Sequence, residues 1–420
     1  MELLKELESF NSFAEVRDHL SSFNIVSKVD PNNDNLYLIT YDRMKSDFTL
    51  PFMKQCRGTI LEKGTNKIVC YTFDKGLDFE YSDYDILDKE MQLRVGGDVL
   101  DWNQCQVEES VDGTQIRLFY YDGKWCKATT RCSDAYRAYW YSKKSFGELF
   151  DEAAELCGLN YDTLDKGCCY SFVLCHPENR IVVSYEKPYL VHVVTRRLDT
   201  FNEVTDTHAV EGALRPKSYK KFSTPWELVN YAHIQTDNNL EGYMVHCVSE
   251  VDGVVTHQRM KIITPAYLEV KELRGNGNNL FFRYLELRQA RLLPSFTQYF
   301  PEFSDQFKAY ETNILNIARE IKTQYINKFV YRSIKEADWH YRPLVYKLHG
   351  EYLETHDKTT MNKVLKHIAE LHPKQLCFMY NRTMHPEWFT SSDAPSAEES
   401  VAVAEESVAL NDVDLVVDAC

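Results

Sequence analysis

The sequence lacks any run of eighteen consecutive apolar residues, although 44% of its 420 residues are hydrophobic. A transmembrane helix needs about twenty such residues, so the composition predicts no membrane span. The segment MELLKELESFNSFAEVRDHL has neither the basic start nor the uninterrupted apolar stretch of a signal peptide, and predicts an amphipathic helix instead. These absences favour a cytoplasmic protein with no membrane partner.

Cysteine pairs of the metal-binding type are also missing. None of the 12 cysteines forms a Cys-x-x-Cys pair, and no cysteine and histidine spacing matches a zinc site. The adjacent Cys168 and Cys169 lie in an apolar stretch. We expect reduced, mostly buried thiols and not a disulfide or zinc framework, and we assign no metal ligands.

Basic residues are in deficit, since 48 Lys and Arg oppose 63 Asp and Glu, and the formal net charge is −15. This charge argues weakly against indiscriminate nucleic-acid binding. Residues 391–420, however, hold eight acids and no base, and without them the net charge falls to −7. Charge alone therefore does not exclude an RNA partner. The same segment lacks aromatic residues and is rich in small ones, so we expect a disordered acidic tail.

The order of hydrophobic patterns predicts an α+β protein. A helical pattern over about 1–25 is followed, up to about 268, by short β-branched and aromatic runs separated by turn signals. Asp122-Gly123 predicts the tight turn of a hairpin. The expected strands include 35–41, 57–62, 66–73 and 180–185, and helices are expected at 134–157 and 225–233.

After residue 268 the character of the sequence changes. GNGNN (275–279) breaks the chain, and apolar residues then recur at spacings of three and four. We predict a mixed α/β domain at 1–268, an all-helical domain at 269–390 and the tail at 391–420. The long helical patterns of the second domain cover 281–293, 306–338 and 359–372.

Several short motifs occur in a fixed order within residues 35–268. The central one is Ser110-Val111-Asp112-Gly113, which alone predicts only a turn, because Asp-Gly occurs at many hairpins. The others, in chain order, are Arg57-Gly58, Lys75, Arg131, Pro177-x-Asn179-Arg180-Ile181-Val182, Glu241-Gly242, and Lys261-x-Ile263-Thr264-x-x-Tyr267.

This series resembles the covalent nucleotidyltransferases, and in particular the RNA ligases of the T-even-phage tRNA-repair type. The resemblance implies a mixed α/β nucleotidyltransferase domain of the ATP-grasp-like ligase kind. The predicted helical domain also stands where that ligase type has a helical C-terminal domain. ATP or AMP with magnesium as cofactors, tRNA or other structured RNA ends as partners, and the host cytoplasm of a virus as location are implied as well.

The catalytic motif of this family is altered in the present sequence. In the family a lysine attacks the α-phosphate of ATP and forms a phosphoramidate, and Ser110 stands at its position. Val173 replaces a carboxylate that helps to hold nucleotide or metal, and Ile263 replaces the second of two phosphate-facing lysines. The resemblance therefore implies a degenerate RNA ligase-like protein, a pseudoenzyme that binds RNA or nucleotide.

The remaining family positions are kept, with Arg131 for the usual lysine. Singly, each has an ordinary interpretation: Arg57 as a strand-end cation, Lys75 as a solvated loop lysine, Glu241 as a turn carboxylate. As an ordered set they favour a pocket. The resemblance implies a catalytic set of Ser110, Glu241 and Lys261, and nucleotide-binding residues Arg57, Lys75, Asp112, Gly113, Arg131, Glu241 and Lys261.

Residues 321–390 interleave bases with aromatic residues and carry a net charge of +4. Aromatic rings can stack on bases while cations contact phosphates, which predicts an RNA surface. Alternatively, the aromatic residues form the helix core and the charges a solvated face. The candidate RNA-binding residues are Lys322, Lys328, Arg332, Arg342 and Lys347.

Two other functions stay open. Phage ligases of this type are also linked to tail-fibre attachment, so an assembly or scaffold protein with a virion or host protein partner is one alternative. An active RNA ligase with a variant mechanism, or one that acts on preadenylated ends, is the other. Val173 and Ile263 weaken that route, because sealing still needs metal and phosphate contacts.

Overall fold

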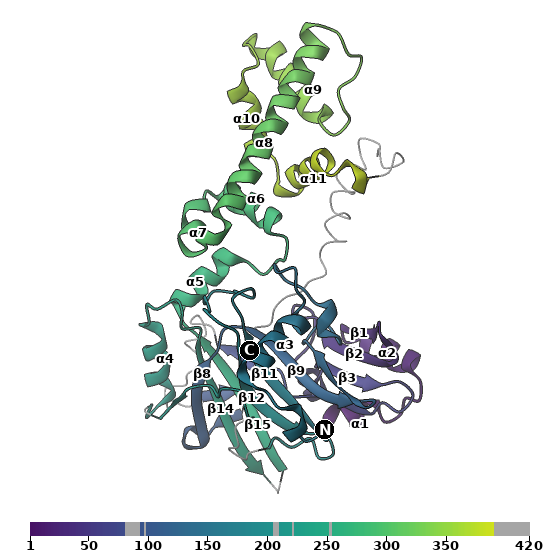
Figure 1. Cartoon of the computed structure of the whole chain (residues 1–420), viewed down its shortest axis with the longest axis vertical. Coiled ribbons are helices and arrows are strands. Elements are labelled where there is room, and N and C mark those ends of the chain that lie inside the picture. The colour runs from purple at the N-terminus through teal and green to yellow at the C-terminus, as the bar shows by residue number, and fades with distance from the viewer. Residues whose placement is uncertain (80–92, 96–97, 205–209, 221, 252–253, 390–420) are drawn as a thin grey trace. The chain divides into compact units, whose positions relative to one another are not determined.

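The computed structural model describes residues 1–79, 93–95, 98–204, 210–220, 222–251 and 254–389 (Figure 1). The described residues form two compact units, unit 1 with residues 1–274 and unit 2 from Gly275 onward. Helix α5 (Pro265–Arg274) belongs to unit 1, so the division lies beyond the boundary expected at 268. Strands and helices together confirm the α+β class, and the expected disordered tail lies outside the described residues.

Unit 1 contains three larger sheets, built almost entirely from antiparallel neighbours. Their strand orders are β1-β2-β3-β4, β10-β9-β11-β12 and β13-β8-β14-β15-β5, and β6 pairs with β7 in a separate ribbon. The strands are β1 (Ile25–Asp30), β2 (Asn33–Tyr41), β3 (Arg57–Glu62), β4 (Ile68–Cys70), β5 (Leu77–Phe79), β6 (Leu93–Val95), β7 (Asp98–Leu100), β8 (Cys105–Ser110), β9 (Thr114–Tyr121), β10 (Lys124–Ala128), β11 (Cys168–Cys175), β12 (Tyr189–Arg197), β13 (Ser218–Tyr219), β14 (Gly242–Val251) and β15 (Val254–Ile263).

The helical pattern at the N-terminus forms two helices, α1 (Glu2–Leu7) and α2 (Phe13–Ser21). They are separate because Ser12 caps α2: its hydroxyl accepts the amide of Glu15, and the Glu15 carboxylate accepts the amide of Ser12. Leucines of both helices pack on the first sheet. Two further helices belong to unit 1, α3 (Phe146–Cys157) and α4 (Pro225–His233).

The sheet that contains β8, β14 and β15 has two different faces. Val107, Tyr243 and Ile262 point to one face and pack with Leu228 and Val229 of α4 in an apolar core. Because side chains alternate along a strand, Glu108, Met244 and Lys261 point to the other face. The register places Met244 opposite both Glu108 and Lys261. The sequence motifs therefore lie on the face that α4 leaves uncovered.

Several predicted elements are confirmed. Asp122 and Gly123, with φ of 47° and 79°, form the β9–β10 turn, and α4 covers the expected range. The strand expected over 66–73 is shorter, since only Ile68–Cys70 pairs, and the helix expected over 134–157 begins at Phe146.

The strand predicted over 180–185 is wrong. The apolar and β-branched residues there favour a strand, but no strand forms over 180–185. The amides of Val182 and Val183 donate to the Asp112 carboxylate, and so are not available to a ladder. A long-range contact thus overrides the local β preference.

The expectation of reduced cysteines is wrong for one pair. A disulfide joins Cys105 of β8 to Cys247 of β14, and the two residues are directly opposite in the sheet. Since 142 positions separate them, no local pattern predicts the pairing. The other nine described cysteines are free thiols, and most of them are buried.

Unit 2 is helical over its described residues. Its helices are α6 (Leu280–Ala290), α7 (Leu293–Tyr299), α8 (Ser304–Tyr325), α9 (Arg342–Thr355), α10 (Met361–Glu370) and α11 (Pro373–Met384). The helix predicted over 306–338 is shorter, because α8 runs into a π-helical turn at Ile326–Val330 and the chain then leaves helical geometry. Among the described residues, no helix is long and apolar enough to cross a membrane.

Gly58 lets β3 approach the segment that carries Arg131. Its φ is 73°, and a Cβ at this position would lie 2.4 Å from the carbonyl oxygen of Thr130. Gly64 has a similar φ of 80°, but a Cβ there would meet nothing within 4 Å. Comparison of the two glycines therefore distinguishes the cost of left-handed backbone from the cost of steric overlap.

We predict that Gly58→Ala lowers the free energy of unfolding of unit 1 far more than Gly64→Ala does. Both changes cost about 1–2 kcal/mol for left-handed backbone. Only the first adds an overlap with backbone atoms, which we expect to cost about 1–3 kcal/mol more. Denaturant unfolding of the two variants measures the difference, and equal destabilisation would contradict the close approach.

Candidate functional site

Three strand ends meet at one place in unit 1. The register sets Gly242, the first residue of β14, opposite Ser110, the last residue of β8, and opposite Ile263, the last residue of β15. The motifs around Ser110, Glu241 and Lys261 are therefore side by side, although 131 positions separate Ser110 from Glu241 in the sequence.

Ser110, Glu241 and Lys261 form one buried cluster. The Ser110 hydroxyl donates to Oε2 of Glu241 at 2.7 Å, and Nζ of Lys261 donates to Oε1 at 2.6 Å. The side chain of Glu241 is fully buried, and that of Lys261 is 5% exposed. Burial of a carboxylate is favourable only when charged and hydrogen-bonding partners surround it, as they do here.

Asp112 has a positioning role in the structure. Its Oδ1 accepts the Tyr267 hydroxyl at 2.8 Å, and its Oδ2 accepts the amides of Val182 at 3.0 Å and Val183 at 2.7 Å. Burial, and then the charge of Glu241, raise the pKa of Asp112, while these hydrogen bonds oppose the rise. The carboxylate therefore links the turn after β8 to the segment with Val182 and Val183 and to Tyr267 of α5.

Gly113 allows that turn to lie against β11. A Cβ on Gly113 would come within 2.6 Å of the Leu174 carbonyl oxygen and 2.7 Å of Cγ1 of Val173. The adjacent Thr114 shares a hydrogen bond with buried Asn179, at 2.9 Å from Nδ2 to Oγ1. The Pro-x-Asn-Arg motif thus also meets the turn.

Arg57 lies at the side of this cleft. Its Nη1 donates to Oε1 of Gln115 at 2.6 Å, and its guanidinium stands 5.0 Å from the centre of the Phe73 ring. Arg259 stacks on the same ring at 5.1 Å. Phe73 therefore lies between two guanidinium groups and links the Arg57 motif to β15.

The other two predicted cations have different surroundings. Nζ of Lys75 donates to the Gly76 carbonyl at 2.9 Å and lies 5.2 Å from the Phe48 ring centre. Arg131 is half-buried, and its Nε has no hydrogen-bond partner in the described part of the chain.

The two further altered positions differ in environment. Val173 is 1% exposed and packs in an apolar cluster with Cys175, Val191 and Val111. Ile263 is half-buried on the same strand face as Lys261. Val173 is therefore part of a buried apolar cluster, while Ile263 shares the strand face of Lys261.

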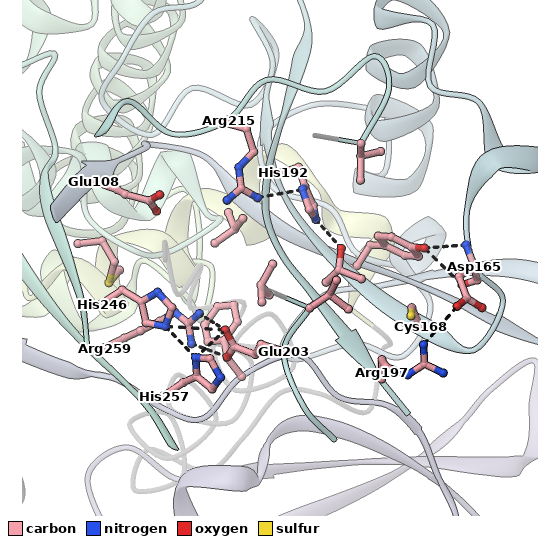
Figure 2. Close-up of a pocket in the computed structure, with 18 of the residues that line it drawn as sticks. Glu108, Asp165, Cys168, His192, Arg197, Glu203, Arg215, His246, His257 and Arg259 are labelled. Carbon is pink, nitrogen blue, oxygen red and sulfur yellow. Dashed lines mark hydrogen bonds and ion pairs between the residues drawn. The ribbon is translucent and has the colours of Figure 1, made fainter. Parts of the chain in front are cut away.

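A cavity of about 580 Å³ lies on the uncovered sheet face, and Ser110, Glu241 and Lys261 are not among the residues that line it (Figure 2). Gln106, Glu108 and Met244 line it on one side, and residues of the edge strand β12, among them His192, line it on the other. Burial raises the pKa of Glu108, and the charges of Arg215 and Arg259 oppose the rise. The volume is within the range of small-molecule sites, about 300–1,000 Å³.

Glu203, His246 and His257 gather at one end of the cavity, with donor atoms within 4.8 Å of one another (Figure 2). The motif analysis missed this group. Arg259 donates to both oxygens of Glu203 at 2.8 and 2.6 Å, and Arg196 donates to Oε1 at 2.5 Å. Two guanidinium groups repel a metal cation, so we assign this group to an ion-pair network.

The candidate RNA-binding cations of unit 2 are of two kinds. Lys328 and Arg342 both pair with Glu336, at 3.5 and 3.7 Å, and Lys347 pairs with Glu370 at 3.7 Å. Lys322 and Arg332 have no ion pair within the described residues.

Both interpretations of the aromatic residues of unit 2 hold in part. Tyr325 and Tyr341 are buried in the helix core, whereas Tyr331 is 72% and Tyr346 42% exposed. The exposed rings lie in the same part of the chain as Arg332 and Lys347, so a surface for stacking and phosphate contacts remains.

Comparison with known proteins finds viral relatives. The chain is 24% identical over 303 residues to the immediate-early protein ICP-46 homolog of Invertebrate iridescent virus 3, covering 68% of this chain and 62% of that protein. It is 28% identical over 233 residues to the RNA ligase of Rhodothermus phage RM378, covering 51% and 52%. The chain thus spans about half to three-fifths of these relatives. No protein-family profile matches.

The similarity to viral RNA ligases supports placement in the covalent nucleotidyltransferase superfamily. Among solved structures, an archaeal ATP-dependent RNA ligase aligns over 74% of both chains, with 11% identity and a TM-score of 0.39. With this score and identity, the alignment indicates only a distant structural similarity. That Ser110, Val173 and Ile263 replace functional residues of the family stays a prediction.

We predict that protonation of His192 destabilises unit 1 in mild acid. His192 is 2% exposed, its Nδ1 accepts from Arg215 at 3.2 Å and its Nε2 lies 2.9 Å from the Thr195 hydroxyl. Burial, and then the Arg215 charge, lower the pKa of His192 to about 4. The unfolded chain therefore binds a proton first, and stability is lost as the pH falls from about 6.5 to 4.

The loss from this residue amounts to roughly 3 kcal/mol, at about 1.4 kcal/mol for each unit of pKa. Unfolding measured between pH 7.5 and 4.5 should show a shallower dependence for His192→Gln than for the natural protein. His233→Gln, at an exposed position of α4, serves as the control. Parallel profiles for His192→Gln and the natural protein would refute the assignment.

Proposed function

We propose that this chain is an RNA ligase-like protein of the T-even-phage tRNA-repair type that binds nucleotide and RNA but does not form a covalent adduct with AMP. The observation that carries the proposal is the hydrogen bond of 2.7 Å from the Ser110 hydroxyl to Glu241. A hydroxyl occupies the position from which the family's lysine attacks. Glu241, which accepts this hydrogen bond, also accepts one from Lys261.

The chemistry of serine explains the loss of activity. A neutral hydroxyl is a weak nucleophile unless a base removes its proton. Lys261 forms an ion pair with Oε1 of the adjacent Glu241. A carboxylate that is paired with an ammonium group is a weak general base. A serine adenylate would also be an ordinary phosphodiester, which resists displacement more than a P–N bond does. Both the first and the second step of ligation would therefore be slow.

The cavity in Figure 2 fits the nucleoside part of such a ligand. Glu108 and Met244, which line it, share the sheet face of Lys261, and we propose that the base lies beside them. The lining combines apolar side chains such as Met244 with charged groups such as Glu108 and Arg215. ATP or AMP is the proposed ligand.

The fit for a protein-bound magnesium is poor at the Ser110 cluster. Both oxygens of Asp112 and both oxygens of Glu241 already accept hydrogen bonds, and Val173 offers no ligand. Magnesium prefers octahedral oxygen coordination and is often held through the phosphates of a nucleotide. We therefore propose that magnesium, where it takes part, enters with ATP.

Intact-protein mass spectrometry after incubation with ATP and magnesium tests the loss of adenylylation. We expect no species that is heavier by one AMP, because Ser110 lacks the required nucleophilicity. An adduct at near-stoichiometric yield would overturn the proposal and favour a variant mechanism.

Ser110→Lys, alone and with Val173→Glu and Ile263→Lys, is the matched series for this experiment. Adduct formation only in the triple variant would mean that all three positions have lost function. Val173 is buried among apolar side chains, so Val173→Glu also needs a check of folding by thermal unfolding. The double variant Ser110→Lys with Ile263→Lys tests the other two positions without burying a carboxylate at position 173.

The RNA partner is proposed from unit 2. Lys322 and Arg332 are cations without an ion pair in the described residues, and Tyr331 is exposed next to Arg332. An unpaired cation can neutralise a phosphate without first breaking a salt bridge. We propose that this part of unit 2 contacts tRNA or structured RNA ends.

Filter binding of nicked and intact tRNA at several salt concentrations tests this contact. We expect Lys322→Gln with Arg332→Gln to weaken binding and to lower the salt slope by about one for each lost phosphate contact. Lys124→Gln, an exposed position of unit 1, is the control. Unchanged affinity and slope in the double variant would exclude this surface.

A further inference from the structure

The end of α8 and the start of α9 expose aromatic side chains to solvent. Tyr331, just after the π-helical turn, is 72% exposed, and Tyr346 of α9 is 42% exposed. Lys328, three residues before Tyr331, has its ammonium 5.3 Å from the centre of the Tyr346 ring, so the two tyrosines belong to one surface. Exposed rings that group together in this way mark interaction surfaces.

The rings of this surface are held in fixed positions. Phe329 stacks on His349, with 3.7 Å between the ring centres, and meets Tyr346 edge-on at 5.6 Å. Phe329 also packs at 5.6 Å beside Tyr325, which is buried in the core of the unit. The Tyr346 hydroxyl donates to Oε2 of Glu336 at 3.2 Å. A platform that is ordered before its ligand arrives loses little conformational entropy on binding.

The charge around these rings is positive when the neighbouring acids are counted. Residues 320–350 hold six bases and three acids, and Glu370 of α10, which pairs with Lys347 at 3.7 Å, is a fourth acid. These groups leave a net charge of +2 with the histidines neutral. Glu351, the next residue along α9, is paired with Lys363 at 3.3 Å. The bases are Lys322, Lys328, Arg332, Lys335, Arg342 and Lys347, and the acids are Glu320, Glu336, Asp338 and Glu370. This end of unit 2 therefore attracts an anionic partner.

Two of these cations are available to a phosphate group beside the exposed rings. Arg332 and Lys335 are exposed and have no ion pair within the described residues. Lys328 and Arg342, by contrast, both pair with Glu336. The available cations thus lie in the segment that directly follows Tyr331.

An unpaired RNA strand fits this combination better than a duplex or a protein does. In a duplex the faces of the bases are stacked on one another, so a protein ring reaches them only where the strand is unpaired. An acidic protein segment would satisfy the cations but offers few flat rings to Tyr331 and Tyr346. Each nucleotide of a single strand, by contrast, carries both a flat ring and a phosphate.

We propose that Tyr331 and Tyr346 stack on bases of an unpaired RNA strand, and that Arg332 and Lys335 contact its phosphates. The partner class is a single-stranded segment or an unpaired end, and not the helical part of an RNA. The inference rests on the proposed RNA-binding function of unit 2, and it names the part of the RNA that this surface contacts. Recognition of this kind tolerates different base sequences, because every base has a flat face.

Binding of the full chain to a single-stranded oligoadenylate and to a blunt RNA duplex, each at several salt concentrations, tests the proposal. We expect Tyr346→Ala to weaken single-strand binding about tenfold with an unchanged salt slope, because a stacked ring makes no phosphate contact. Lys335→Gln should instead lower the salt slope by about 0.7. Tyr346→Phe keeps the ring and should bind as the natural protein does. Tyr139→Ala, at a position of unit 1 that is 43% exposed, is the matched control and should bind normally.

The possible outcomes separate this inference from the proposed function. Equal single-strand affinity of Tyr346→Ala and the natural protein overturns the stacking, and so does equal affinity of the natural protein for strand and duplex. A loss of affinity in Tyr346→Phe together with a lower unfolding temperature assigns Tyr346 a structural role and also overturns it. Binding that depends on Lys322 and Arg332 but not on Tyr346 refutes the stacking and leaves the proposed RNA contact standing. Failure of the natural protein to bind either RNA refutes both, and favours an acidic protein partner for this surface.

Discussion

The carboxylate of Asp112 is the constraint on which the candidate site depends. It accepts hydrogen bonds from Val182, Val183 and Tyr267, which belong to two segments far from it in sequence. These bonds fix the turn between β8 and β9, the segment after β11 and the start of α5. A buried carboxylate that lost one of these donors would remain desolvated, so the three segments are held as a unit.

The position of Ser110 follows from that constraint. Because the turn after β8 is fixed, the last residue of β8 stays in register with Gly242, and its hydroxyl meets Glu241. Because α5 is fixed through Tyr267, Lys271 meets the same carboxylate from the helix. One structural carboxylate therefore sets the geometry around a second one, Glu241, which Ser110 and Lys261 contact. Asp112 and Glu241 look alike in sequence but have different roles.

The sequence predicts the parts of the fold that local rules determine. The Asp122-Gly123 turn, the strand over 57–62 and the helix over 225–233 depend on turn chemistry and periodicity, and all three are present. The failed strand over 180–185 and the Cys105–Cys247 disulfide depend on contacts distant in sequence. Local patterns contain no information about such partners.

The same distinction applies to the candidate site. The motifs could indicate Ser110, Glu241 and Lys261, because each stands beside a recognisable glycine, threonine or tyrosine. They could not indicate that Nζ of Lys271 lies 3.9 Å from Glu241, since a lysine four residues after Tyr267 in a helix is an ordinary pattern. The motifs also could not indicate the ion-pair network around Glu203. Its members come from β12, β14, β15 and the segment after β12, which are far apart in the sequence.

In the proposed function, Ser110, Val173 and Ile263 have different consequences for binding and for catalysis. Ser110 keeps a hydrogen bond to Glu241, so the replacement removes the amine without leaving the carboxylate unsatisfied. Val173 packs in a buried apolar cluster with Val111 and Val191, and it offers no ligand to a nucleotide or metal. Ile263 offers no charge to a phosphate group. In the proposed function the covalent step, which needs one particular atom, is lost more completely than phosphate binding, which needs only net positive charge within reach.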